Sequence, residues 1–345
     1  TGSTLKANRL KILDDGVIER FRLSFRALAG AVEAARELGL ALILVGQEAK
    51  IRPELARHDR AGLSISVVDA AQEITMEDKP GDVVRSKPQS SMHVGMRLVR
   101  QGEADAFVTM GNTGGALAVA LFELGRIKLD GQRRIHRPAL ATRFPTKSGS
   151  CLLLDIGANT DWKPIYLQQF AAMGNIYAKS MLGLASPRVG IVSIGEEEGK
   201  GNIEVKEAYD LIKATPGLNF VGNLEGKDIP AGNADVVVTD GFTGNVILKL
   251  SEGVASLIVQ GLREEIMRTT RTKLGGLLAK PAFRAFGQRM DYAEYGGAVL
   301  LGLNHICIIG HGRSNARAVR SAIKVASEAV RTDVPGQIRA GLSQN

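Results

Sequence analysis

The sequence is poor in cysteine and in aromatic residues. Among its 345 residues there are two cysteines, and aromatic residues make up 5%. Cys151 and Cys307 are far apart and each lies in an apolar run, so the chain has neither a disulfide framework nor a zinc motif, and both thiols are expected in the core. A binder of single-stranded nucleic acid needs aromatic side chains interleaved with basic ones, and that pattern is missing. We therefore predict a protein of a reducing cytoplasm with no nucleic-acid partner.

Sequence motifs of several enzyme classes are missing as well. No G-x-G-x-x-G follows the first predicted strand, no Walker lysine motif is present, and no Ser/His/Asp order suggests a hydrolase. No signal peptide opens the chain, and no apolar run approaches the ~18 residues of a membrane-spanning helix. Dinucleotide and P-loop chemistry are thus disfavoured, and we predict neither a cofactor nor a bound metal.

Positive charge and glycine are abundant. The formal net charge is +8 and there are 40 glycines, while hydrophobic residues make up 44% of the chain. The charge favours an anionic partner, such as phosphate, an acidic protein or a membrane surface. The length and apolar content suit one large α/β domain, which we place over residues 1–345.

Apolar, β-branched runs alternate with segments of helical period. The predicted strands are Ala41–Val45, Ala106–Thr109, Leu152–Ile156, Arg188–Ile194, Asn219–Gly222, Ala234–Thr239 and His305–Ile309. The predicted helices are Glu19–Leu38, Ser90–Gln101, Gly114–Gly125, Pro164–Leu182, Ile203–Ala214, Asn245–Arg268 and Ser314–Val330. This alternation predicts an α/β fold, Rossmann-like, with a mostly parallel sheet in a three-layer αβα arrangement. Ligands of such sheets bind beyond the carboxyl ends of the strands, where the Gly/Asn-rich segments of this chain fall.

The loop Met110–Gly115 follows a predicted strand and opens a helix. Glycines let the backbone approach a ligand, and a helix start offers free N–H groups that suit phosphate. Asn112, Thr113 and Gly114 are the candidate binding residues. The alternative is a plain helix cap made by Asn112 or Thr113.

The loop Leu154–Pro164 places Asp155, Asn159 and Lys163 in one turn, with Pro164 suited to the first helical position. The aspartate can orient a lysine or an asparagine. The alternative is an Asx-type turn.

The loop Ser193–Asn202 carries Lys200 between two glycines. A lysine there can bind phosphate as a point charge and stabilise a developing oxyanion. We expect at least one of the three preceding glutamates to belong to a solvated loop face.

Two further Gly-rich loops, Val238–Asn245 and Gly310–Ala316, also follow strands. For Asn245 the alternative is helix capping, and a lone loop histidine is more often structural than catalytic. Their candidate residues are Asp240, Thr243, Asn245, His311, Ser314 and Asn315.

The segment Ile266–Met290 is basic and apolar and contains no acidic residue. Gly275-Gly276 and Pro281 are expected to interrupt any single helix there. The segment could lie on an anionic membrane or dock an acidic partner; the alternative is a helix pair with a solvated basic face. Its candidate contact residues are Leu277, Leu278, Phe283, Phe286, Arg271 and Lys273.

Taken in order, these segments resemble the motif set of the PlsX phosphate acyltransferases over roughly Ala41 to Val330. The segments are Gly111-Asn-Thr-Gly, Arg137-Pro-Ala-Leu, Asp155-Ile-Gly-Ala-Asn, Gly195-Glu-Glu-Glu-Gly-Lys-Gly-Asn, Phe220-Val-Gly-Asn, Thr239-Asp-Gly-Phe-Thr-Gly-Asn, Asp291-Tyr-Ala-Glu-Tyr-Gly-Gly and His311-Gly-Arg-Ser-Asn-Ala, with Leu44-Val-Gly and Ser90-Ser-Met upstream. The chain departs from the family at its first strand, because Asp14-Asp-Gly16 stands where the family has Asp-Ala-Met-Gly-Gly-Asp.

The resemblance implies that phosphate attacks the thioester of an acyl group on acyl carrier protein, giving acyl-phosphate for phospholipid synthesis. For this reaction we assign Lys200 to phosphate binding or oxyanion stabilisation and Asn245 to a hydrogen bond with the carbonyl or the phosphate. Asn112, Thr113 and Asn159 are expected to form a supporting shell. The resemblance also implies a homodimer and a projecting helical hairpin, placed over residues 255–295, that contacts the membrane. We expect a cytoplasmic protein that is peripheral at the inner face of the membrane.

Two other functions stay open. One is a phosphotransacetylase-like enzyme that uses acyl-CoA, since the residues do not separate a free thioester from a carrier-borne one. The other is a membrane-associated scaffold without catalysis, which the changed loop after the first strand favours.

Overall fold

One mixed sheet of eleven strands forms the centre of the molecule, in the order β3-β2-β1-β4-β11-β10-β5-β6-β9-β7-β8. The computed structural model describes residues 13–14, 23–130, 133–290, 296–310 and 314–343. The strands are β1 Leu13–Asp14, β2 Leu42–Gly46, β3 Ile65–Asp69, β4 Ala106–Thr109, β5 Ala139–Thr146, β6 Gly149–Leu154, β7 Arg188–Val192, β8 Asn219–Leu224, β9 Val236–Val238, β10 Ala298–Leu301 and β11 Ile306–Ile309. Only the pairs β10–β11, β10–β5 and β5–β6 are antiparallel among these strands.

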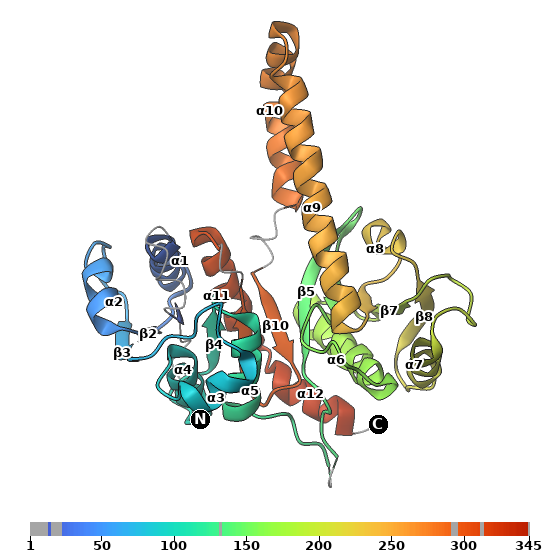
Figure 1. The fold of residues 1–345 in the computed structure, drawn as a ribbon, viewed down its shortest axis with the longest axis horizontal. Coiled ribbons are helices and arrows are strands. Elements are labelled where there is room, and N and C mark those ends of the chain that lie inside the picture. Colours follow the sequence, from blue (N-terminus) through green and yellow to red (C-terminus); the bar gives the residue numbers. More distant parts are fainter. Residues whose placement is uncertain (1–12, 15–22, 131–132, 291–295, 311–313, 344–345) are drawn as a thin grey trace, which may run out of the picture.

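Helices cover both faces of this sheet (Figure 1). They are α1 Leu23–Leu38, α2 Glu48–Leu55, α3 Pro80–Ser86, α4 Ser91–Arg100, α5 Thr113–Glu123, α6 Pro164–Leu182, α7 Ile203–Lys213, α8 Asp228–Ala231, α9 Gly241–Ile266, α10 Thr270–Met290, α11 Ala316–Arg331 and α12 Val334–Ser343. Successive residues of a strand point to opposite faces. Accordingly Leu152 and Leu154 join one apolar cluster, with α1, α6 and α11, whereas Cys151 and Leu153 join the other, with α4 and α5.

The predicted α/β fold with a mostly parallel sheet is confirmed. Every predicted strand has a counterpart, and α6 has the predicted bounds Pro164–Leu182. The sequence reading missed β3, β5, β10 and several short helices. β5 contains Arg143 and Pro145, which weaken its strand signal. β10 is as short as β4 and β11, so its length does not explain why it was missed. Strands β5 and β10 matter most, because they make the antiparallel pairings in the middle of the sheet.

Helices α9 and α10 form an antiparallel pair that extends away from the sheet (Figure 1). The expectation that Gly275-Gly276 and Pro281 break a helix here is wrong, since α10 runs through all of them. A Cβ at Gly276 would collide with the Ile266 side chain, whereas one at Gly275 would meet no atom within 4 Å. Gly276 therefore allows the close approach of the two helices, and helix pairing outweighs the low helix propensity of these residues.

Candidate active site

The Gly-rich loops fall into two sets, because the two halves of the sheet run in opposite directions. Strands β1 to β4 and β11 are mutually parallel, and so are β6, β7, β8 and β9. Three antiparallel pairings lie between the two groups and reverse the direction. The carboxyl ends of the groups thus lie at opposite ends of their strands, and the expectation that all these loops share one sheet edge is wrong.

Asp155 is the anchor of the set that follows β6, β9 and β7. Its carboxylate is fully buried and accepts five hydrogen bonds, from the N–H groups of Leu140, Gly157, Ala158 and Asn159 and from the Asn159 amide, at 2.8–3.2 Å. Burial raises the pKa of Asp155, and the bonds from Ala158, Asn159 and Leu140 act against that rise. Asp155 thus orients an asparagine, which is one of the roles foreseen for it.

Asn159 links this loop to Pro138, the residue directly before β5. Its amide donates to the carbonyl of Pro138 at 2.8 Å as well as to Asp155, and its side chain is buried. Its backbone carbonyl accepts from the N–H of Gly241 at 2.8 Å. Three segments far apart in sequence therefore meet at Asn159.

Asp240, and not Asn245, caps α9. The Asp240 carboxylate accepts from the N–H groups of Phe242 and Thr243, both at 2.9 Å. Asn245 lies one turn further on, and its amide donates to the carbonyl of Ile156 at 3.2 Å. A Cβ at Gly244 would collide with the Asp155 carbonyl, so the first turn of α9 needs glycine to lie against the Asp155 loop. This contact brings Asn245, Asp155 and Asn159 together.

Lys200 lies on the exposed loop after β7, a strand that pairs with β9. Its backbone N–H donates to the Glu197 carbonyl at 3.0 Å, and its ammonium group makes no hydrogen bond or ion pair with any residue that the structure describes. Two of the three preceding glutamates are paired, Glu196 with Lys227 at 3.0 Å and Glu198 with Lys213. Lys200 is therefore a cation available to a ligand, and two of its acidic neighbours pair with other lysines.

The second set of loops follows β4 and β11. Asn112 caps α5 by accepting from the N–H of Gly115 at 2.9 Å, and its amide donates to the Thr75 carbonyl at 3.0 Å. Thr113 is exposed and Gly114 lies against Pro80. Asn315 caps α11 by accepting from Ala318 N–H at 2.9 Å, and Ser314 is buried. His311 lies outside the described residues.

Some residues around these loops were not singled out from the sequence. Asp78 accepts from the Thr75 N–H and the Lys87 ammonium, both at 2.6 Å, and so holds the segment that receives the Asn112 amide. Pro138, which receives the Asn159 amide, belongs to the Arg137-Pro-Ala-Leu segment and could have been found there. Lys163 precedes α6 and is exposed. It takes no part in the hydrogen bonds that join Asp155 and Asn159.

Cysteine chemistry is unsuited to this site. Cys151 and Cys307 are buried as predicted, and burial raises the pKa of each thiol to about 12, so neither is a thiolate at neutral pH. Glu196, Glu225 and Asp228 lie close together, but Lys227 pairs with both glutamates and Asp228 accepts hydrogen bonds from Glu225 and Asn233. These carboxylates are therefore already satisfied by the protein.

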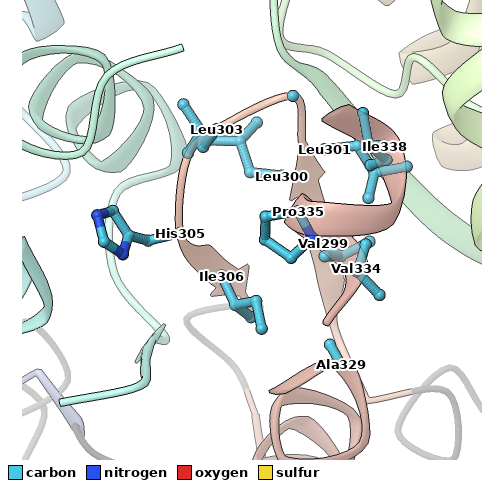
Figure 2. Close-up of a pocket in the computed structure, with 11 residues that line it drawn as sticks. Val299, Leu300, Leu301, Leu303, His305, Ile306, Ala329, Val334, Pro335 and Ile338 are labelled. Atoms are coloured by element: carbon cyan, nitrogen blue, oxygen red, sulfur yellow. The ribbon is translucent and has the colours of Figure 1, made fainter. Parts of the chain in front are cut away.

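A small apolar pocket lies elsewhere, between the β10–β11 turn and α12 (Figure 2). Val299, Leu301, Val334 and Ile338 are among its lining residues, and its volume is about 10 Å³. That space holds about one water molecule. It is too small for a substrate and lies apart from both loop sets.

The chain matches the family described as "Fatty acid synthesis protein" over residues 24–337. It is 49% identical over 298 residues to the "Phosphate acyltransferase" of Nitratidesulfovibrio vulgaris, covering 86% of this chain and 85% of the relative. It is 48% identical over 313 residues to the "Phosphate acyltransferase" of Pelotomaculum thermopropionicum, covering 91% and 90% of the two chains.

Solved structures share the fold at much lower identity. The EutD phosphotransacetylase from Staphylococcus aureus aligns with a TM-score of 0.60 and 17% identity over 94% of each chain. A branched-chain phosphotransacylase from Enterococcus faecalis V583 aligns with a TM-score of 0.55 and 13% identity, over 93% of this chain and 99% of that one. The chain therefore belongs to the fatty acid synthesis protein family, that of the PlsX phosphate acyltransferases, and it is an acyltransferase.

Proposed function

We propose that the enzyme transfers an acyl group from acyl carrier protein to inorganic phosphate. A phosphate oxygen attacks the thioester carbonyl, the new C–O bond forms and the C–S bond breaks. The thiol of the carrier protein leaves as thiolate and takes up a proton, and the acyl-phosphate feeds phosphatidic acid synthesis. The identity to phosphate acyltransferases over most of the chain supports the reaction class.

The exposed ammonium of Lys200 is the observation that carries this proposal. The reaction brings a dianionic nucleophile next to a carbonyl that becomes an oxyanion, so it needs a positive charge that is not already paired. Lys200 is an exposed lysine whose ammonium group has no partner among the residues that the structure describes, so it meets this need. Its neighbours Glu196 and Glu198 form ion pairs with Lys227 and Lys213 and not with Lys200.

Asn245 hydrogen-bonds the substrate carbonyl or the phosphate in this proposal. It lies against the loop of Asp155 and Asn159, and its amide N–H faces the Ile156 carbonyl. In this proposal Asn159 supports the loop against which Asn245 lies, and Asn112 and Thr113 support the second loop set, which follows β4 and β11. The buried amides of Asn112 and Asn159 each bridge two segments, so their contribution is to fix the shape of the loops.

A matched pair of lysine variants tests the role of Lys200. Lys200→Ala should lower turnover by about 10²–10³-fold, the usual effect of losing one oxyanion donor, with an unchanged unfolding midpoint. Lys206→Ala, an exposed lysine in α7, removes the same charge and should keep wild-type turnover. Near-wild-type turnover of Lys200→Ala would refute the assignment.

The substrate is tested by release of free thiol from palmitoyl-ACP, with and without phosphate. Release that requires both the carrier and phosphate supports the proposal. Release from palmitoyl-CoA alone would favour the phosphotransacetylase-like alternative, which the fold shared with EutD phosphotransacetylase supports. Carrier binding without release would favour the scaffold; the loop on which that alternative depends lies within residues 15–22, outside the described residues.

We also propose a cytoplasmic homodimer that contacts the inner face of the membrane through α9 and α10. Leu257 and Leu278 are 70% and 77% exposed, so this pair leaves apolar surface that a second copy or lipid could cover. Contrary to the sequence expectation, α9 is long and apolar enough to cross a membrane by length and composition alone. Its apolar residues fit a peripheral contact as well, because α10 beside it carries Arg271 and Lys273.

A further inference from the structure

A basic arm, defined here as the described residues 126–130 and 133–137, lies between α5 and β5. Its basic residues are Arg126, Lys128, Arg133, Arg134 and Arg137, and Asp130 is its one acidic residue. The described part is hairpin-like: Leu129 N–H donates to the Arg133 carbonyl and Ile135 N–H to the Ile127 carbonyl, both at 3.0 Å. Ile127 and Ile135 are completely buried and anchor the arm, whereas Lys128 and Arg134 between them are exposed.

The cations of the arm are not matched by acidic side chains. None of its five basic residues forms an ion pair with a carboxylate in the described part of the chain, although arginines elsewhere do, such as Arg188 with Asp235 at 2.9 Å. Burial together with the charges of Arg134 and Arg137 lowers the pKa of Arg126. Cations held close together without counter-charge create a strong local field for an anionic ligand.

The arm is continuous with the candidate active site. The residue after Arg137 is Pro138, whose carbonyl accepts the Asn159 amide at 2.8 Å, and the Leu140 N–H donates to Asp155. The ring of His136 stacks on Tyr166 in the first turn of α6, at 5.9 Å between centroids. A protein seated on the arm would therefore lie at the edge of the Asp155–Asn159 loop.

The exposure of these cations identifies the kind of anion. Lys128, Arg133, Arg134 and Arg137 are all exposed, so several cations can be contacted at once by one large anionic surface. Insertion into a membrane surface needs apolar side chains beside the basic ones, but Ile127 and Ile135 are buried. An acidic protein surface fits this arrangement, and such charge complementarity mainly steers encounter.

We propose that the basic arm is the docking surface for the acidic carrier protein that delivers the acyl thioester. This inference rests on the proposed function, because the carrier is its substrate. It places docking on the arm and not on Arg271 and Lys273 of α10, which were the candidates from the sequence.

The test compares charge-reversal variants of the full chain. Arg133→Glu/Arg134→Glu should raise KM for palmitoyl-ACP about tenfold or more, with kcat and KM for phosphate within about twofold of wild type. Wild-type KM for the carrier substrate should rise with salt, and this dependence should be weaker in the variant. Lys50→Glu/Arg60→Glu, exposed residues near α2, makes the same change in net charge and should leave KM unchanged.

Several results would overturn the proposal. They are an equal rise in KM for both double variants, a rise in KM for phosphate in the arm variant, and a rise in KM for the carrier substrate only in Arg271→Glu/Lys273→Glu. If Arg133→Glu/Arg134→Glu lost binding to phosphatidylglycerol vesicles but bound the carrier protein as wild type does, the proposal would also be overturned. Should Arg133→Glu/Arg134→Glu fold poorly, Arg133→Ala/Arg134→Ala is expected to give a smaller change in the same direction.

Direct binding separates this proposal from the proposed function. Fluorescence anisotropy of labelled acyl-free carrier protein reports docking without turnover. Wild-type binding that is lost in the arm variant supports docking even when no thiol is released, a result that would defeat only the proposed reaction. Equal binding by wild type and the arm variant would defeat docking alone.

Discussion

The α/β body buries its large apolar side chains, whereas the α9–α10 pair exposes many of its own. In the body, strands and helices bury Phe107, Phe170 and Leu154 almost completely. In α9 the buried residues are Gly241 and Gly244, and both lie in the first turn, against the Asp155 loop. The body is therefore stabilised by its own core, whereas the outer part of the helix pair has no core of its own in the single chain.

This difference indicates which apolar residues serve folding and which serve contact with another surface. Leu257, Ile258, Leu277 and Leu278 are each more than half exposed, and large apolar side chains gathered on one projecting element are typical of a contact surface. The body fixes the start of α9 through glycines and the Asp240 cap, so the orientation of the pair follows from the same contacts that shape the candidate active site.

The largest expected effect contrasts one core residue with one residue of the pair. Phe170→Ala in α6 should lower the free energy of unfolding by about 3–5 kcal/mol, because it leaves a cavity in the core. Leu278→Ala should change it by no more than about 0.5 kcal/mol, since this side chain is 77% exposed. Urea unfolding followed by circular dichroism measures both.

A large cost for Leu278→Ala would contradict the view that this residue is free of folding contacts. Repeating the unfolding at several protein concentrations then shows whether a second copy covers it, because dimer stability depends on concentration.

The second prediction concerns what the apolar surface of the pair contacts. Replacing Leu277, Leu278, Phe283 and Phe286 with serine should weaken binding to anionic vesicles about tenfold or more, since each buried side chain of this size contributes about 1.5–3 kcal/mol. Sedimentation with liposomes measures the bound fraction. Met76→Ser/Phe122→Ser removes exposed apolar residues of the body and should bind like wild type; unchanged binding by the first variant would remove the membrane role from α10.

The smallest expected effect lies in the body, at the segment that holds Asn112. The hydrogen bond from Lys87 and those from Thr75 hold the pKa of Asp78 below its ordinary value of 3.8. Because the folded pKa is lowered, the stabilisation is present above the unfolded pKa and is lost as the pH falls through the folded value. Asp78→Asn should therefore cost about 1 kcal/mol at pH 7, and the difference from wild type should shrink below about pH 4.

Acid and neutral urea titrations of both proteins measure this difference. Lys87→Met should cost at least as much at neutral pH, because it removes both the ion pair with Asp78 and the hydrogen bond to the Glu73 carbonyl. A difference that stays constant from pH 7 to pH 3 would show that Asp78 acts through packing and not through its charge.

Much of the local structure around the candidate site could be read from the sequence. Asn112, Asn202 and Asn315 were placed at helix starts, and each accepts a hydrogen bond from the N–H three residues later. The possibility that Asn245 caps α9 is wrong by about one turn, because Asp240 accepts the hydrogen bonds from the first N–H groups of the helix. The ordered motifs were enough to identify the family. All of these features depend on residues close together in the chain or on their order.

The tertiary structure decided which of these loops meet. The amide of Asn245 reaches a carbonyl 89 residues away in the chain and that of Asn159 one 21 residues away, and no local pattern encodes either bond. The short strands β5 and β10 reverse the sheet and divide the loops into two sets, and the contact of Gly276 with Ile266 lets α10 continue through residues that favour breaking a helix. The sequence by itself thus determined the elements, their caps and the family, because these follow from neighbours in the chain. Strand direction and the meeting of distant loops were decided by packing of the whole molecule, because their free energy comes from contacts that exist only after folding.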